Sequence, residues 1–209
     1  MAVRLFSAHV SFDVGGIDLD AFPAVMEQYL LRTRHTLELE GVAMRLVQRG
    51  FPEDDTAHFV RAVCRWGGYP GIAGRVLKSN DAHKIRRALL GAVDALAEGD
   101  GHAPRRALES INAIRGLGTP SFASKHLRFL DPATCPVLDR LVARNYGYPL
   151  TPHGYELYAT DCGNIARALR VAGKANPVPT RTNSWAAADV DAVLFALIKS
   201  WTPGGLGTP

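Results

Sequence analysis

The segment from Gly116 to Pro120, with the sequence GLGTP, has the composition of a turn that could bind a phosphate group. Gly116 and Gly118 have no Cβ, so the backbone can turn tightly there and approach another molecule closely. The residues before this turn predict an amphipathic helix. Behind it, Thr119 is a suitable N-cap and Pro120 a suitable first residue of a second helix. Unpaired backbone N–H groups at the start of that helix would suit a phosphate.

The surroundings of this glycine turn are basic. Between His102 and Arg128, five basic residues stand against the single acid Glu109, which is a local excess of four positive charges. The whole chain carries a formal net charge of +4, so the remaining segments are close to neutral. Positive charge concentrated beside a phosphate-sized turn favours a nucleic-acid ligand.

Two further residues could take part in chemistry. Asp139 follows Pro136 and is predicted to open a helix, 21 residues after Gly118. An ionised carboxylate can activate water, or stabilise the positive charge that builds on a sugar when an N-glycosidic bond breaks. An acid in the first turn of a helix is also favoured by the helix dipole alone. Lys125, on the helix after the turn, could be a nucleophile, a phosphate contact or a solvated side chain.

Length and composition set the class of protein. A chain of 209 residues, 47% hydrophobic and 21% charged, is typical of one soluble globular domain with two lobes. No apolar run approaches the roughly 18 residues of a membrane span, and the first residues do not resemble a secretory signal. Three widely spaced cysteines favour a reducing compartment and exclude a CxxC zinc site. We therefore expect a cytoplasmic protein that does not bind membranes and needs no obligate protein partner.

The elements that must position these residues are predicted to be mainly helical. Apolar periodicity and stop signals predict ten helices, at about 21–34, 37–49, 54–67, 71–78, 82–98, 104–114, 120–130, 137–146, 153–172 and 187–201. A β-rich stretch within residues 1–19 predicts a short N-terminal β-hairpin. A second copy of GLGTP, at 205–209, has no helix after it, so residues 202–209 are predicted to form a flexible tail.

The segment 111–142, INAIRGLGTPSFASKHLRFLDPATCPVLDRLV, resembles the helix–hairpin–helix DNA glycosylases, especially their 8-oxoguanine-glycosylase-like branch. The resemblance covers about a third of the chain and rests on the order of hairpin, helix, proline and aspartate. It implies a single domain over 1–209, with two helical lobes around a base-binding cleft and the hairpin and catalytic segment at 104–146. It also implies that the partner is double-stranded DNA containing a modified base, and that Asp139 faces the sugar of a flipped nucleotide.

The resemblance also implies roles for other residues. The DNA backbone would be bound by Arg115, Gly116, Leu117, Gly118, Thr119, Ser121 and Lys125. Aromatic candidates for the base pocket are Phe122, Trp66, Tyr69 and Trp185, although each is also typical of a hydrophobic core. No cofactor is expected apart from a structural monovalent cation, K⁺ or Na⁺. In many relatives hairpin carbonyls bind this ion, and here these would belong to Asn112, Ile114 and Leu117.

One departure from the family concerns the mechanism. Bifunctional members carry a nucleophilic lysine two positions after the second hairpin glycine, where this chain has Pro120. This predicts a monofunctional enzyme that uses water, with Lys125 as the one substitute nucleophile. The missing lysine favours a hypermodified phage base, such as glucosylated hydroxymethylcytosine, over an oxidised purine such as 8-oxoguanine. A non-catalytic DNA-binding module with the same hairpin, or a helical protein with no DNA role, remains the alternative.

Overall fold

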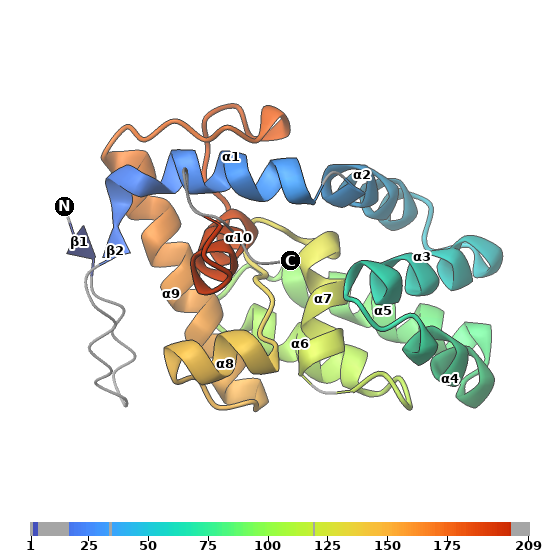
Figure 1. Cartoon of the computed structure of the whole chain (residues 1–209). Coiled ribbons are helices and arrows are strands. Elements are labelled where there is room, and N and C mark those ends of the chain that lie inside the picture. Colours follow the sequence, from blue (N-terminus) through green and yellow to red (C-terminus); the bar gives the residue numbers. More distant parts are fainter. Residues whose placement is uncertain (1, 4–16, 34, 119, 202–209) are drawn as a thin grey trace.

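The computed structural model describes residues 2–3, 17–33, 35–118 and 120–201, and over these residues the protein is mainly helical (Figure 1). A two-residue antiparallel pair, β1 (Ala2–Val3) and β2 (Ile17–Asp18), precedes the helices. Short 3₁₀ turns lie at Leu19–Ala21 and Pro179–Arg181. The α-helices are α1 (Phe22–Arg32), α2 (His35–Gln48), α3 (Glu53–Trp66), α4 (Gly71–Ser79), α5 (Ala82–Ala97), α6 (Ala103–Asn112), α7 (Ser121–Leu130), α8 (Arg140–Tyr146), α9 (Pro152–Val171) and α10 (Ala187–Ile198).

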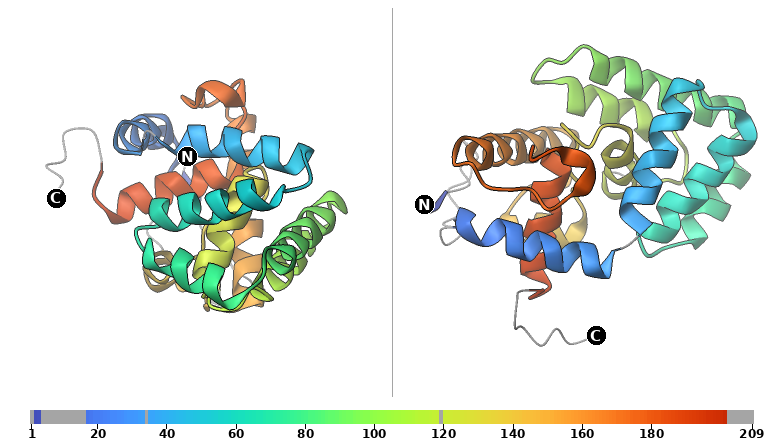
Figure 2. Two further views of the ribbon diagram at one scale, coloured as in Figure 1. Left: turned by 90° about the vertical axis from the view of Figure 1, so that its right-hand side faces the viewer. Right: turned by 90° about the horizontal axis from the view of Figure 1, so that it is seen from above.

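The helices form two groups. Helices α2 to α7 pack on one another on one side, while α1, α8, α9 and α10 lie on the other side (Figures 1 and 2). The α6–α9 contact joins the two groups. The first and last helices, α1 and α10, pack together although they lie at opposite ends of the described chain. This arrangement confirms the predicted fold class, which was a mainly helical protein with two lobes.

The ten predicted helices are confirmed, with ends that differ by a few residues. The largest differences are at the start of α8 and the end of α10. Helix α8 begins at Arg140, not at 137, because the Asp139 side chain caps it, and α10 ends at Ile198, not at 201. Pro120 is the N-cap of α7 and not its first helical residue, and Thr119 lies outside the described residues. The predicted β-hairpin is confirmed only as the β1–β2 pair. Its turn and the predicted tail at 202–209 lie outside the described residues.

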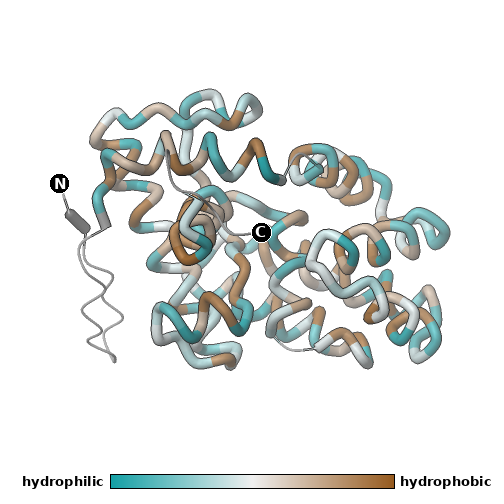
Figure 3. Tube along the Cα trace, viewed as in Figure 1, coloured by the Kyte–Doolittle hydropathy of each residue, from teal (hydrophilic) through white to brown (hydrophobic). Residues whose placement is uncertain are grey.

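Helix α7 occupies the centre of the molecule. Every residue from Phe122 to Phe129 is buried. Most of the other helices carry hydrophobic residues on one face and hydrophilic residues on the other (Figure 3), and α10 is the apolar exception. The amphipathic α6 covers one side of α7, and α2 and α3 cover others. Among the described helices none has the length and hydropathy needed to cross a bilayer. A helix enclosed in this way can hold polar side chains away from water.

A buried ion-pair network joins α7 to both groups of helices. Arg128 of α7 is only 2% exposed and donates to Glu40 of α2 at 2.8 Å. Glu40 also pairs at 3.0 Å with Arg181, which pairs at 3.0 Å with the buried Asp189 of α10. The Arg128 guanidinium lies over the Trp66 ring, 5.5 Å from its centroid. Since buried charges are tolerated only when they are paired, this network fixes the orientation of α7.

The start of α9 depends on a glycine that nothing larger can replace. A Cβ at Gly154 would come within 2.0 Å of the Pro149 carbonyl oxygen. We expect Gly154→Ala to lower the free energy of unfolding by about 2 kcal/mol or more, because backbone atoms must move. Gly163→Ala, in the same helix but facing open space, should raise it by up to about 1 kcal/mol. Thermal denaturation distinguishes the two, and equal effects would contradict this packing.

Candidate active site

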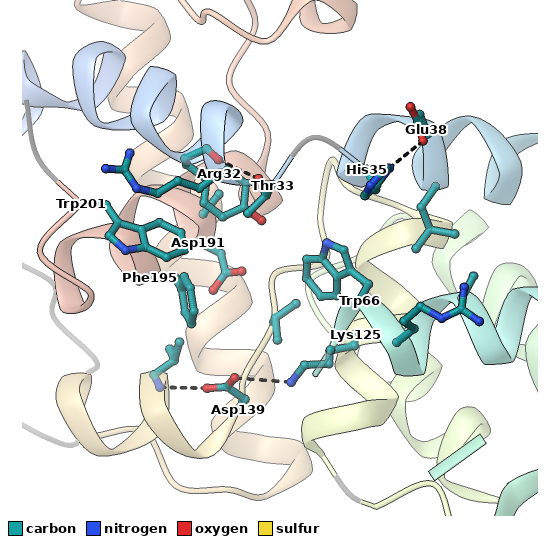
Figure 4. A pocket seen from close by; sticks show the side chains of 18 of the residues that line it. Arg32, Thr33, His35, Glu38, Trp66, Lys125, Asp139, Asp191, Phe195 and Trp201 are labelled. Atoms are coloured by element: carbon teal, nitrogen blue, oxygen red, sulfur yellow. Dashed lines mark hydrogen bonds and ion pairs between the residues drawn. The ribbon is translucent and has the colours of Figure 1, made fainter. Parts of the chain in front are cut away.

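A cavity of about 720 Å³ lies between the two groups of helices (Figure 4). Its walls come from α1, α2, α3, α7, α10 and the segment around the start of α8. Aromatic rings and ionisable groups both line it. The residues used below are Arg32, Trp66, Gly67, Lys125, Asp139, Asp191, Phe195 and Trp201. The cavity has the size of a typical small-molecule pocket, with apolar walls and a few convergent polar groups.

Lys125 and Asp139 meet at one end of this cavity. The Lys125 Nζ lies 3.4 Å from Asp139 Oδ2 and 3.2 Å from Ser121 Oγ. It also lies over the Phe122 ring, 4.9 Å from the centroid. The Lys125 side chain is 7% exposed and that of Asp139 is 21% exposed. The structure therefore brings together the two residues that the sequence singled out for chemistry, and Lys125 is neither solvated nor on the surface.

The Asp139 carboxylate is fixed by the helix that it caps. Its Oδ1 accepts hydrogen bonds from the backbone N–H groups of Leu141 (2.9 Å) and Val142 (3.1 Å). This is ordinary N-cap geometry, for which aspartate is among the preferred residues. The cap uses Oδ1, so Oδ2 remains directed toward Lys125 (Figure 4). The same side chain can therefore start a helix and present one carboxylate oxygen to the cavity.

The environment of Lys125 makes its charged form less favourable than in water. Burial lowers the pKa of Lys125, and the nearby Asp139 carboxylate only partly opposes this effect. Room for the buried stem is provided by Gly67 at the end of α3. A Cβ at Gly67 would come within 2.8 Å of Lys125 Cδ and 3.0 Å of Phe122 Cε1. A desolvated amine with a lowered pKa is the state in which lysine acts as a nucleophile.

Asp191 of α10 is a second carboxyl group that lines the cavity, and nothing in the sequence pointed to it. Its Oδ1 accepts a hydrogen bond from the Tyr158 hydroxyl at 2.7 Å. Burial raises the pKa of Asp191 to about 7. Phe195, one turn further along α10, and Trp201 also line the cavity. In the sequence, Asp191 and Phe195 have the same helical spacing as the core residues of α10, so nothing marks them as residues of a cavity.

The glycine turn lies next to α4 and is held by it. Arg75 Nε donates to the Gly116 carbonyl at 3.1 Å, and Asn80 bonds both the N–H and the carbonyl of Arg115. Gly116 and Gly118 have φ angles of 84° and 85°, which only glycine adopts without strain. No described residue accepts a hydrogen bond from either glycine N–H. Arg75 and Asn80 were not anticipated, because nothing in the sequence places α4 beside the turn.

The other predicted DNA contacts differ in exposure. Arg115 and Gly118 are exposed, so they can reach a phosphate. The Leu117 side chain is buried in the core, which leaves only its backbone available to DNA. Ser121 receives the hydrogen bond from Lys125, and its residue is half-buried.

The four aromatic candidates for a base pocket have different positions. Trp66 lines the cavity, with its Nε1 donating to Thr36 Oγ1 at 2.9 Å. The Phe122 ring lies against the amine of Lys125 and is not among the residues that line the cavity. Tyr69 is 67% exposed beyond the cavity, with its ring edge-on to Phe122. Trp185 is 1% exposed in the core, edge-on to Phe22 of α1.

The monovalent cation predicted near the glycine turn remains a prediction, and two oxygens there bear on it. The Ile114 carbonyl, one of the three predicted ligands, accepts only a long 3.4 Å hydrogen bond from the Leu117 N–H. Asn112 Oδ1 is buried with no partner among the described residues. Uncharged oxygen donors suit a hard cation such as K⁺ or Na⁺. Over the same described residues, no group of three or more His, Cys, Asp or Glu side chains could bind a metal ion.

A helix–glycine turn–helix motif beside a cavity with a paired lysine and aspartate defines a helix–hairpin–helix protein with an enzyme-like pocket. The chain belongs to the family described as "Putative 8-oxoguanine DNA glycosylase OGG-like protein", whose model matches residues 28–195. The match confirms the resemblance that the 111–142 segment indicated, and it extends over both groups of helices. A search of curated proteins and a search of solved structures each gave no match. Family membership supports a DNA glycosylase with DNA as its partner.

Filling the space at Gly67 should displace the buried amine without unfolding the protein. Gly67 has a φ of −72°, so alanine fits the backbone, and the atoms that it meets belong to the flexible Lys125 stem and to Phe122. We expect Gly67→Ala to raise the pKa of Lys125 toward its usual value of 10.5, because the amine moves into water. NMR titration of the ¹³C-methylated lysine measures this. Gly163→Ala is the control, and an unchanged Lys125 pKa in Gly67→Ala would contradict the packing argument.

Proposed function

We propose that this protein is a DNA glycosylase that takes one modified base out of the double helix and breaks its N-glycosidic bond. The observation that carries the proposal is the Lys125–Asp139 pair, 3.4 Å apart, at one end of a cavity of about 720 Å³. A base cannot be reached inside a duplex, so it must enter a pocket of this kind. The sugar would then lie against Lys125 and Asp139, and the base would extend toward Asp191 and Phe195.

The buried amine supports Lys125 as the nucleophile. Its neutral form would attack C1′ of the sugar, and the electron pair of the glycosidic bond would leave with the base. Opening of the sugar ring, with a proton transferred to the ring oxygen, would then give a protonated imine on Lys125. Asp139 would stabilise the positive charge that develops on the sugar. A water nucleophile, which Pro120 predicts, is the competing mechanism.

The glycine turn would bind the DNA backbone near the extruded nucleotide. The free N–H groups of Gly116 and Gly118 can donate to a phosphate, and the exposed Arg115 adds positive charge. A monovalent cation, when bound to the nearby oxygens, would supply further positive charge at the same place.

Two kinds of base compete as the substrate. The volume of the cavity favours a base with a bulky substituent, such as the glucosylated hydroxymethylcytosine of phage DNA, and therefore a role in defence. The name of the matching family favours 8-oxoguanine and therefore a role in repair. Polar side chains that line the cavity away from Lys125, among them Arg32 and Asp191, could bind the hydroxyl groups of a sugar substituent. We place the hypermodified base first and the oxidised purine second.

A non-catalytic DNA-binding module is the alternative from another class. Such a module would use the glycine turn, but it has no need of a desolvated lysine beside a carboxylate. Burying an amine lowers stability unless something compensates for it. The position of Lys125 therefore favours an enzyme over a binding module.

Reductive trapping tests the chemistry. With borohydride present, the protein should become covalently attached to duplexes containing 8-oxoguanine or glucosylated hydroxymethylcytosine. Lys125→Ala should abolish the adduct, whereas Lys199→Ala, which removes an exposed lysine, should not. Asp139→Asn should slow single-turnover base release by about a hundredfold or more. Base release without an adduct would favour the water mechanism, and no release from any duplex in a broad panel would favour the binding module.

The glycine turn should contribute affinity that does not depend on sequence. Gly118 has a positive φ and faces open space, so Gly118→Ala places a methyl group where a phosphate would lie. We expect weaker binding to every duplex and a shallower dependence of affinity on salt. Gly99→Ala is the matched control, because Gly99 also has a positive φ and open space, but lies between α5 and α6. Equal affinity of the two variants for unmodified DNA would contradict the phosphate contact.

A further inference from the structure

Asp191 lies where the base of an extruded nucleotide would be. In Figure 4 its carboxyl group lies between Phe195 and Trp201 on one side and Trp66 on the other. Lys125 and Asp139 line the same cavity and lie below Asp191 in this view. A nucleotide with its sugar against Lys125 would therefore direct its base between these rings toward Asp191. This placement of the nucleotide rests on the proposed function.

The charged and titratable groups around Asp191 do not compensate for a buried carboxylate. One oxygen accepts from the Tyr158 hydroxyl, and the backbone N–H of Val137 also faces the carboxyl group. The cation Arg128 favours ionisation of Asp191, but it is already paired with Glu40, and Asp139 opposes ionisation. The groups that interact with Asp191 from the surrounding elements are Tyr29, Lys125, Arg128, Asp139, Tyr146, Tyr155, Tyr158 and Cys162.

The balance favours a carboxyl group that still carries its proton in a large share of the molecules near neutral pH. Burial is the dominant effect and raises the pKa of Asp191 to about 7, against the lowering effects of Tyr158, Val137 and Arg128. A carboxylic acid near neutral pH, beside a carboxylate with a different role, is a common arrangement in enzymes that break glycosidic bonds. In the described structure Asp139 accepts two backbone hydrogen bonds and lies beside Lys125, whereas Asp191 has the buried surroundings of the acid.

We propose that Asp191 is the general acid that protonates the departing base. As the C1′–N bond breaks, its electron pair moves onto the base, and the Asp191 proton transfers to a nitrogen or oxygen at the edge of the base. The base leaves as a neutral molecule, and Asp191 remains as a carboxylate that takes a proton from solvent before the next turnover. The step balances with either Lys125 or water as the nucleophile. It requires a base with a proton acceptor on the edge that faces α10.

The pH dependence of base release tests this assignment. Single-turnover release from a duplex with 8-oxoguanine opposite cytosine, and from glucosylated phage DNA, should slow as the pH rises above about 7, because the acid form is lost. Asp191→Asn keeps the size and the hydrogen bonding but has no transferable proton. It should reduce release by about a hundredfold and remove the decline at high pH. A variant that keeps the full rate and the decline would overturn the proposal.

Two controls separate proton transfer from a structural effect. Asp161→Asn alters another buried aspartate, which accepts from the Tyr148 hydroxyl outside the cavity and whose pKa is also raised by burial. It should leave release unchanged. Borohydride trapping on a duplex with an abasic site needs no proton for a leaving base. Asp191→Asn should therefore lose at least tenfold more base release than trapping, and equal losses would overturn the proposal.

A titration of the unaltered protein covers the case in which Asp191→Asn does not fold or no base is released. With a tetrahydrofuran duplex bound, the ¹³C carboxyl signal of Asp191 should titrate near pH 7. A titration near the usual aspartate value of about 4 would overturn the proposal, because the group would then be ionised at neutral pH. If Lys125→Ala and Asp139→Asn both release base normally, the part of the proposed function that places the reaction at these two residues fails. If only Asp191→Asn releases base at the normal rate, the proposed function stands and the assignment of Asp191 as the acid fails.

Discussion

The burial of two basic side chains on α7 is the constraint on which the rest of the site depends. Arg128 and Lys125 are three residues apart, so they lie on neighbouring positions of one helix face. The charge of Arg128 is compensated by Glu40 and by the Trp66 ring, and removing one partner of such a pair typically costs about 3–5 kcal/mol. This pairing fixes α7 and therefore fixes Lys125 beside Asp139. Lys125 itself has weaker compensation, and its lowered pKa is the result.

The parts of this arrangement that depend on local sequence could be predicted. Apolar periodicity, glycines and prolines define all ten helices, because these signals act within one or two turns. Asp139 was predicted at a helix start, and its carboxylate caps α8. The turn at Gly116 and Gly118 was predicted from the glycines, and both residues have the positive φ angles that such a turn requires.

The parts that depend on tertiary packing could not be predicted. A lysine on a short helix is usually solvated, and the burial of Lys125 depends on the space that Gly67 leaves on α3. Asp191 was missed because α10 is apolar almost throughout, and only its packing shows which face meets the cavity. Tyr69 and Trp185 share their residue types with pocket aromatics, but one is exposed and the other enclosed in the core.

The contact between α1 and α10 has a consequence for the newly made chain. The ribosome releases α1 early, but α10 only after all the other helices have left the exit tunnel. Until α10 docks, one wall of the cavity is missing, and the carboxyl group of Asp191 is in water. Among the described helices, α10 is the one synthesised last, and it completes this wall of the cavity. The glycine turn between α6 and α7 is therefore synthesised well before the wall of the cavity that α10 provides.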